Sequence, residues 1–126
     1  MRVLICDDSL GFPTLVETWL RDDGRFEVVG RANGGEQAKA LVAEHHPDVI
    51  LLDLLLPDAP DPPKLVSALR ALYPPLRVLL VSSLQSDLLE EAARSAGADG
   101  VAHKGATSAE LTDRLYAVAQ SEGAGA

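Results

Sequence analysis

The stretch VILLD occupies residues 49–53 and sets four apolar side chains in a row directly before a carboxylate. Similar short runs begin at Val3 and Val78. A strand with one exposed face alternates apolar and polar residues, whereas an unbroken run is typical of a strand buried on both faces of a parallel sheet. The run at residues 49–53 therefore predicts a central parallel strand.

Working outward, five strands are expected, at residues 3–6, 26–29, 49–52, 78–81 and, with a weaker pattern, 99–102. The segments between them carry apolar residues at helical spacing, for example Phe12, Leu15, Val16 and Trp19 at i, i+3, i+4 and i+7. Strands that alternate with helices predict an α/β fold, a doubly wound, five-stranded parallel sheet flanked by five helices.

Local signals mark where several helices begin and end. Asn33 precedes Glu36 by three residues, and Thr107 precedes Glu110 in the same way, so both pairs predict capping boxes. Glycines stand where the first and fourth helices should end, as residues that tolerate a positive φ.

Composition limits the class of protein. The 126 residues suit one domain, expected at residues 1–120, and the small, polar residues 121–126 suggest a flexible tail or linker stub. Cys6 is the only cysteine, so an intramolecular disulfide is excluded and a cytoplasmic location is expected. The net charge of −8 disfavours direct binding to nucleic acid, and no apolar stretch is long enough to span a membrane.

Polar residues that carry chemistry stand at or just beyond the ends of the expected strands. Asp7 and Asp8 follow the first strand, Asp53 ends the third, Ser82 ends the fourth and Lys104 follows the fifth. The carboxyl ends of parallel strands share one edge of the sheet, where ligands of such folds bind. Any one of these residues alone is more simply a turn or cap residue, but together they predict a site of three carboxylates, a hydroxyl and an ammonium.

Asp53 is the sharpest signal, because a charge at the end of a buried strand must be compensated. Two carboxylates about 4 Å apart repel by about 4 kcal/mol at an effective dielectric of about 20, and Mg²⁺, which prefers oxygen ligands, relieves this repulsion. A carboxylate held there can act as a nucleophile and form an aspartyl phosphate. These residues predict Mg²⁺-dependent phosphoryl acceptance on Asp53.

Four segments contain these residues and span nearly the whole chain. They read CDDS at residues 6–9, LLDLLLP at 51–57, LVSS at 80–83 and GADGVAHK at 97–104. Taken together, they resemble the receiver domain of two-component response regulators. The resemblance implies a flavodoxin-like sheet with strand order 2-1-3-4-5. It also implies a phosphoacceptor switch rather than an enzyme, one that changes an interaction surface and can control an output domain outside this chain.

The resemblance assigns a role to each residue of the predicted metal site. Asp53 is similar to the phosphoacceptor of the family. Asp8 and Asp53 would bind Mg²⁺ through their side chains, and Asp7 would hold it largely through water. Leu55 would offer its backbone carbonyl.

The same resemblance implies the remaining roles and the partners. Ser82 resembles the switch hydroxyl that moves to the phosphoryl group, and Lys104 resembles the lysine that pairs with that group. The implied phosphodonor is a sensor histidine kinase or a phosphotransfer protein, and the fourth and fifth helices are the implied homodimer surface.

The chain departs from the family at several positions. Val101 stands where the family often has an aromatic switch residue, and Gly105 follows Lys104 where proline is frequent, which leaves the geometry of that peptide bond open. Leu55 and Leu84, two residues beyond the phosphoacceptor and the switch hydroxyl, are apolar and cannot orient an attacking water. We therefore expect slow loss of the phosphoryl group.

Two alternatives remain at the level of sequence. A nucleotide-binding protein or enzyme on the same fold would need a glycine-rich phosphate loop after the first strand, but residues 7–11 read DDSLG. A phosphatase with an aspartate nucleophile would need D-x-D, whereas the aspartates here are adjacent. A phosphorylation-independent interaction module is the other alternative.

Overall fold

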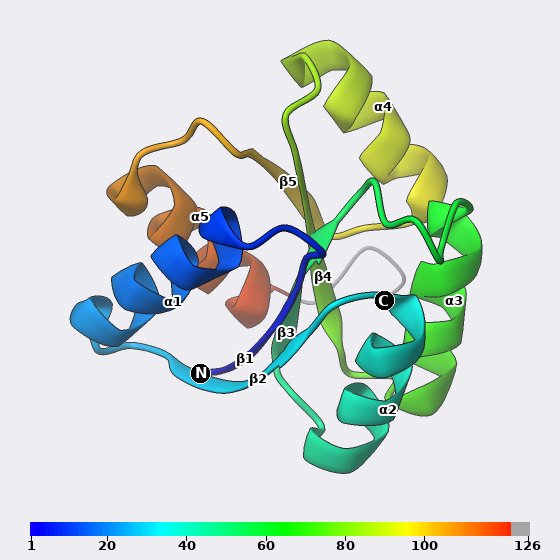
Figure 1. The fold of residues 1–126 in the computed structure, drawn as a ribbon, viewed down its shortest axis with the longest axis horizontal. Helices are drawn as coiled ribbons and strands as arrows, with labels where there is room; N and C mark the ends of the chain where they lie inside the picture. Colours follow the sequence, from blue (N-terminus) through cyan, green and yellow to red (C-terminus); the bar gives the residue numbers. More distant parts are fainter. Residues whose placement is uncertain (122–126) are drawn as a thin grey trace.

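The computed structural model describes residues 1–121, apart from the Ser86 side chain, so most of the tail predicted at 121–126 lies outside the described residues. Figure 1 shows a sheet with helices on both faces. The strands are β1 (Arg2–Cys6), β2 (Glu27–Ala32), β3 (Val49–Asp53), β4 (Arg77–Ser82) and β5 (Gly100–His103). The helices are α1 (Gly11–Asp23), α2 (Gly35–His45), α3 (Pro62–Leu72), α4 (Ser86–Ala96) and α5 (Ser108–Gln120).

The sheet has the predicted topology. Its order is β2-β1-β3-β4-β5, and every neighbouring pair is parallel. Helices α1 and α5 cover one face, while α2, α3 and α4 cover the other (Figure 1). The doubly wound, flavodoxin-like architecture is thereby confirmed, and it places the carboxyl ends of β1, β3, β4 and β5 along one edge.

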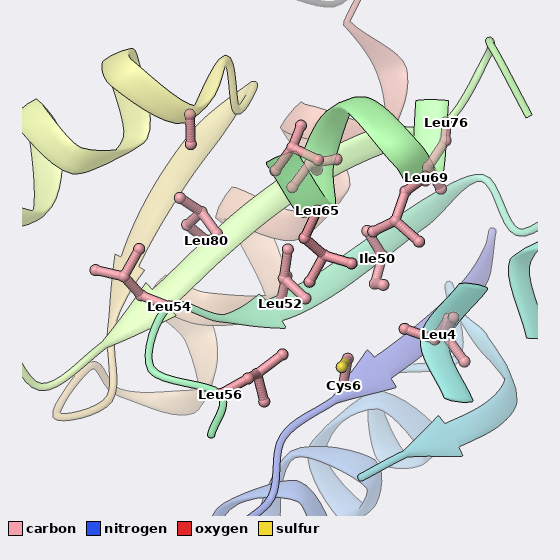
Figure 2. Packing of buried hydrophobic residues seen from close by; sticks show 14 of the residues in the cluster. Leu4, Cys6, Ile50, Leu52, Leu54, Leu56, Leu65, Leu69, Leu76 and Leu80 are labelled. Carbon is pink, nitrogen blue, oxygen red and sulfur yellow. The ribbon is translucent and has the colours of Figure 1, made fainter. Parts of the chain in front are cut away.

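Two apolar clusters explain the unbroken runs in the sequence. Along β3, Ile50 and Leu52 pack toward α2, α3 and α4 (Figure 2), whereas Val49 and Leu51 pack toward α1 and α5. All four side chains are at most 1% exposed. Burial of a leucine side chain contributes about 2 kcal/mol, so a polar substitution on either face of β3 removes core stabilisation.

Strand β2 and the start of α2 differ from the prediction. The strand extends to Ala32 because its second half pairs with β1 beyond a register shift, an edge-strand feature that hydrophobicity does not reveal. The predicted capping box of Asn33 and Glu36 is wrong, since the N-cap of α2 is Gly34 and no side-chain cap is formed there. Instead, the carboxylate of Asp58 accepts hydrogen bonds from backbone amides of the first turn.

The other helix ends agree with the sequence signals. Thr107 and Glu110 form the predicted capping box at the start of α5. Gly24 and Gly97 end α1 and α4 with φ values of 82° and 76°, in the left-handed region that favours glycine. Asp61 caps α3 by accepting from the Lys64 amide, and prolines fill the first positions of that helix.

A partly buried ion pair ties α3 to the loop before β5. Arg70 Nη2 lies 2.6 Å from Asp99 Oδ2, and the side chain of Asp99 is 1% exposed. The same carboxylate oxygen accepts from the Val78 amide at 2.7 Å. No helix within residues 1–121 combines the length and the apolar character that crossing a bilayer requires.

Candidate functional site

Three carboxylates meet at the carboxyl edge of the sheet. Asp7 and Asp8 follow β1, Asp53 ends β3, and these two strands are neighbours. One oxygen from each side chain lies within 4.8 Å of the others. Asp7 and Asp53 are buried while Asp8 is exposed, so the cluster has two desolvated charges and one side that is open to solvent.

Asp7 is fixed by its own loop. Its Oδ1 accepts hydrogen bonds from the Ser9 amide at 2.8 Å and from the Ser9 hydroxyl at 2.6 Å. Burial alone would raise the pKa of Asp7, but these bonds and the nearby Lys104 ammonium outweigh burial and lower it. Asp7 is therefore held as a carboxylate, ready to serve as an oxygen ligand.

Lys104 is shared between two of the carboxylates. Its Nζ lies 3.0 Å from Asp7 Oδ2 and 3.5 Å from Asp53 Oδ2. Burial opposes the charge of Lys104, but both carboxylates outweigh it and raise its pKa. The ammonium also lies 5.2 Å from the ring centroid of Phe12, in cation–π contact. The three carboxylates and the Lys104 ammonium thus give this site a net charge of −2.

At Asp53 the effects on the pKa balance in the opposite direction from those at Asp7. Its side chain is 6% exposed, and its Oδ1 accepts one long hydrogen bond from the Leu55 amide at 3.2 Å. Burial, together with the negative charge of Asp7, raises the pKa of Asp53 despite the bond from Leu55 and the charge of Lys104. A carboxylate with a raised pKa is more basic, and hence a better nucleophile, than an ordinary surface aspartate.

Ser82 lies on the same edge as the acidic cluster. It ends β4, and the preceding residue, Val81, pairs with Asp53 across the sheet. Ser82 is 1% exposed, its Oγ accepts from the Leu84 amide at 3.2 Å, and its carbonyl accepts from the Lys104 amide at 3.0 Å. Backbone pairing therefore fixes Ser82 relative to both Asp53 and Lys104.

The apolar positions near the site have different surroundings. Leu55 is 64% exposed, whereas Leu84 packs partly against the core cluster on the α2, α3 and α4 side. Val101 also packs against that cluster. All peptide bonds in residues 1–121 are trans, including the one between Lys104 and Gly105.

Sequence reasoning assigned no role to several residues that shape the site. Ser9 fixes Asp7 and Phe12 contacts Lys104, as described above. His103 bridges two loops, with Nε2 placed 3.1 Å from the Ser83 carbonyl and Nδ1 accepting from the Gly105 amide at 2.8 Å. The spacing of Asp7 and Ser9 is a turn signal that could have been used. The contacts of Phe12 with Lys104 and of His103 with Ser83 join distant segments and leave no local signature.

The residues present fit a hard divalent cation. All three side chains offer carboxylate oxygens, the donors that Mg²⁺ prefers. Asp7 Oδ2 is buried and, within the described residues, has no directed hydrogen bond, although Lys104 lies close enough for an ion pair. A buried carboxylate oxygen needs further compensation, and a cation bound beside Asp8 would supply it.

Comparisons with known proteins agree with this geometry. The NarL transcriptional regulatory protein of Mycobacterium tuberculosis is 35% identical over 111 residues, which are 88% of this chain and 51% of that protein. A protein-glutamate methylesterase/protein-glutamine glutaminase of Myxococcus xanthus is 40% identical over 84 residues, or 67% of this chain and 23% of that protein. The chain spans about half the length, or less, of these curated relatives.

Solved structures show the same fold. The signal receiver domain of Mycobacterium tuberculosis NarL superposes with a TM-score of 0.83 at 33% identity, covering 94% of this chain and 95% of that one. The response regulator domain of Thermotoga maritima CheB has a TM-score of 0.82 at 26% identity, covering 96% and 97%. The response regulator receiver domain family matches residues 3–116, and the chain therefore belongs to this family of two-component signalling domains.

Proposed function

We propose that this receiver domain accepts a phosphoryl group on Asp53 in a reaction that depends on Mg²⁺. The observation that carries the proposal is the position of Asp53, a 6% exposed carboxylate that shares one cluster with Asp7, Asp8 and Lys104. Its raised pKa marks a basic carboxylate, and titratable groups shifted by burial and a charged neighbour are typical of functional sites.

The chain's own groups have distinct tasks in this transfer. Asp53 forms the new oxygen–phosphorus bond while the bond from phosphorus to the donor breaks, and the donor keeps the electron pair. Lys104 supplies a point charge close to Asp53 Oδ2. Ser82 offers a hydroxyl from the neighbouring strand end. Positioning and charge neutralisation dominate such a reaction, because the protein has little covalent chemistry to perform.

The metal ligands belong to the proposal as well. Asp8 and Asp53 would bind Mg²⁺ directly, Asp7 largely through water, and Leu55 through its backbone carbonyl. When bound, the cation supplies neutralisation of the negative charge that gathers on phosphoryl oxygens. A solved relative gives independent support, since a complex of Borrelia burgdorferi CheY with CheX is described with BeF₃ and Mg²⁺, at a TM-score of 0.80 and 25% identity.

The proposed donor is a phosphohistidine on a sensor histidine kinase or a phosphotransfer protein, in the cytoplasm. The proposed output is a change of interaction surface, with a homodimer through α4 and α5 as the assembly to test. Direct contact with nucleic acid is not expected of this domain, because the chain has a net charge of −8.

Incubation with acetyl phosphate and Mg²⁺, followed by intact-mass measurement, tests the proposal. Wild type should gain one phosphoryl group, and Asp53→Asn should gain none. Omission of Mg²⁺ should prevent uptake by wild type. Equal incorporation by wild type and Asp53→Asn would refute the assignment of the acceptor, and an absence of uptake together with an absence of beryllofluoride binding would favour a phosphorylation-independent interaction module.

A further inference from the structure

Asp58 connects the loop after Asp53 to a helix that begins elsewhere in the chain. It lies between β3 and α3, yet its Oδ1 accepts from the Gly35 amide at 2.9 Å and its Oδ2 from the Glu36 amide at 3.3 Å. These amides belong to the first turn of α2, whose donors have no partner within the helix. The two backbone bonds lower the pKa of Asp58, so the tie is made by the ionised carboxylate.

The segment before α2 is shaped to receive this carboxylate. A Cβ added to Gly34 would lie 2.7 Å from Asp58 Oδ1, a distance that real Cβ contacts do not reach. A Cβ added to Gly35 would lie 3.0 Å from that of Ala59. Paired glycines therefore let the loop approach α2 closely.

The same short loop leads back to the proposed phosphorylation site. Leu54 donates its amide to the Val81 carbonyl, and Leu56 is buried in the core at 4% exposure (Figure 2). The Ala59 amide then donates to the Leu56 carbonyl at 3.1 Å and closes a turn that contains Pro57 and Asp58. Leu55 lies between these anchors, and its side chain is 64% exposed.

A hollow of about 380 Å³ lies where the loop meets α2, lined by Asp8, Asn33, Gly34, Glu36, Gln37, Pro57 and Asp58. Asp8 thus borders the same space as the tie. A shift of the loop relative to α2 would change the surroundings of Asp8 as well as the position of Leu55.

We propose that Asp58 is a positioning residue for the phosphorylation site: by fixing the β3–α3 loop to the N-terminus of α2, it sets the loop geometry that tight Mg²⁺ binding requires. This inference rests on the proposed function above. Because coupling between two sites is reciprocal, Mg²⁺ binding also stabilises the first turn of α2.

Removal of the tie should weaken metal binding. Loss of a group bonded directly to a metal ligand lowers affinity about 10–100-fold, and Asp58 acts one step further away. We expect Asp58→Ala to raise the Mg²⁺ dissociation constant about three- to tenfold, measured by isothermal titration calorimetry. In wild type, Mg²⁺ should slow amide hydrogen exchange at Gly35 and Glu36, and in Asp58→Ala this effect should disappear.

Matched variants separate positioning from charge and from helix capping. Asp58→Asn loses the charge but keeps an oxygen that can accept from Gly35, so positioning predicts near-wild-type affinity. Glu36→Gln removes a charge from the same hollow without cutting the tie, and should leave affinity unchanged. Asp61→Ala removes a cap of similar kind from α3, and should lower stability without the change in affinity.

The outcomes separate the role of Asp58 from the proposed function. Weak binding by Asp58→Ala with normal binding by Asp58→Asn and Glu36→Gln supports the inference. Equal weakening in Asp58→Asn and Glu36→Gln would assign the effect to charge and overturn it, as would unchanged affinity in Asp58→Ala. Failure of wild type itself to bind Mg²⁺ or to accept a phosphoryl group would instead overturn the proposed function, and this inference with it.

Discussion

Without a divalent cation, Asp53→Asn should make the folded domain more stable than wild type. One oxygen of each carboxylate lies within 4.8 Å of the others, and two unit charges at that distance repel by about 3 kcal/mol at an effective dielectric of about 20. Asp53 faces two such neighbours, Asp7 and Asp8, and its charge is also buried. Loss of the attraction to Lys104, 3.5 Å from Asp53, costs about 5 kcal/mol at the same dielectric and offsets most of this relief. We expect a net gain of about 1 kcal/mol, or about 4 °C in Tm for a domain of this size.

Addition of Mg²⁺ should close this gap, and a large excess of Mg²⁺ should reverse the order of stability. A ligand at about ten times its dissociation constant stabilises the fold by about 1.4 kcal/mol, so wild type should gain about 4–6 °C. Asp53→Asn lacks one proposed ligand and should gain much less. Glu44→Gln, an exposed acid on α2, is the control and should follow wild type. Thermal unfolding followed by circular dichroism, in excess EDTA and then in rising Mg²⁺, measures both effects.

The pH dependence of folding stability provides a second test of the repulsion at Asp53. The folded state raises the pKa of Asp53, mainly by burial and then by the charge of Asp7, so between the unfolded and folded values the folded state binds more protons. Stability of wild type therefore falls as pH rises through that window, and the advantage of Asp53→Asn is complete above it. The advantage should shrink as pH falls toward about 4. The reasoning would be refuted if Asp53→Asn were less stable than wild type in EDTA, or if Mg²⁺ raised the Tm of both proteins equally.

Three further predictions concern other parts of the domain. Leu55→Asn combined with Leu84→Glu should accelerate loss of the phosphoryl group, timed by intact mass after donor removal; an unchanged rate would contradict the expectation that apolar residues at these two positions slow the attack of water. Asp99→Asn should cost about 2–4 kcal/mol in denaturant unfolding, because it breaks the ion pair between Arg70 and the buried Asp99 carboxylate, whereas Asp113→Asn removes an exposed partner of Arg25 and should change little. Cys6 is buried and its pKa is raised to about 12, chiefly by desolvation, so native protein should resist thiol reagents that label it at once in denaturant; fast native labelling would show that the strand opens.

The sheet was predictable because its central strands are buried on both faces. The continuous apolar runs that begin at Val3, Val49 and Val78 do not fit an element with one polar face. The strands found at these positions confirm the prediction. The edge strand β2 was predicted less well. Arg31 lies in its second half and is exposed, so backbone pairing with β1, rather than side-chain burial, decides where that strand ends.

The candidate site was also predictable only in part. Asp7, Asp53 and Lys104 were predicted together because topology alone brings strand ends to one edge. The contact of Phe12 with Lys104 depends on how α1 packs against the sheet, and the cap that Asp58 provides depends on two loops meeting. Sequence spacing records neither contact, since each joins segments whose separation in the chain has no fixed period.

The charge of the site would couple the proposed metal binding to the proposed phosphorylation. Three carboxylates and one ammonium sum to −2, a charge that one Mg²⁺ would neutralise. Conversion of Asp53 to an aspartyl phosphate adds negative charge beside Lys104, which now lies closer to Asp7 than to Asp53. Because lysine is a mobile point charge, we expect Lys104 to follow that added charge and to leave the compensation of Asp7 Oδ2 to the cation and its water ligands. In that case metal binding and phosphorylation would reinforce each other.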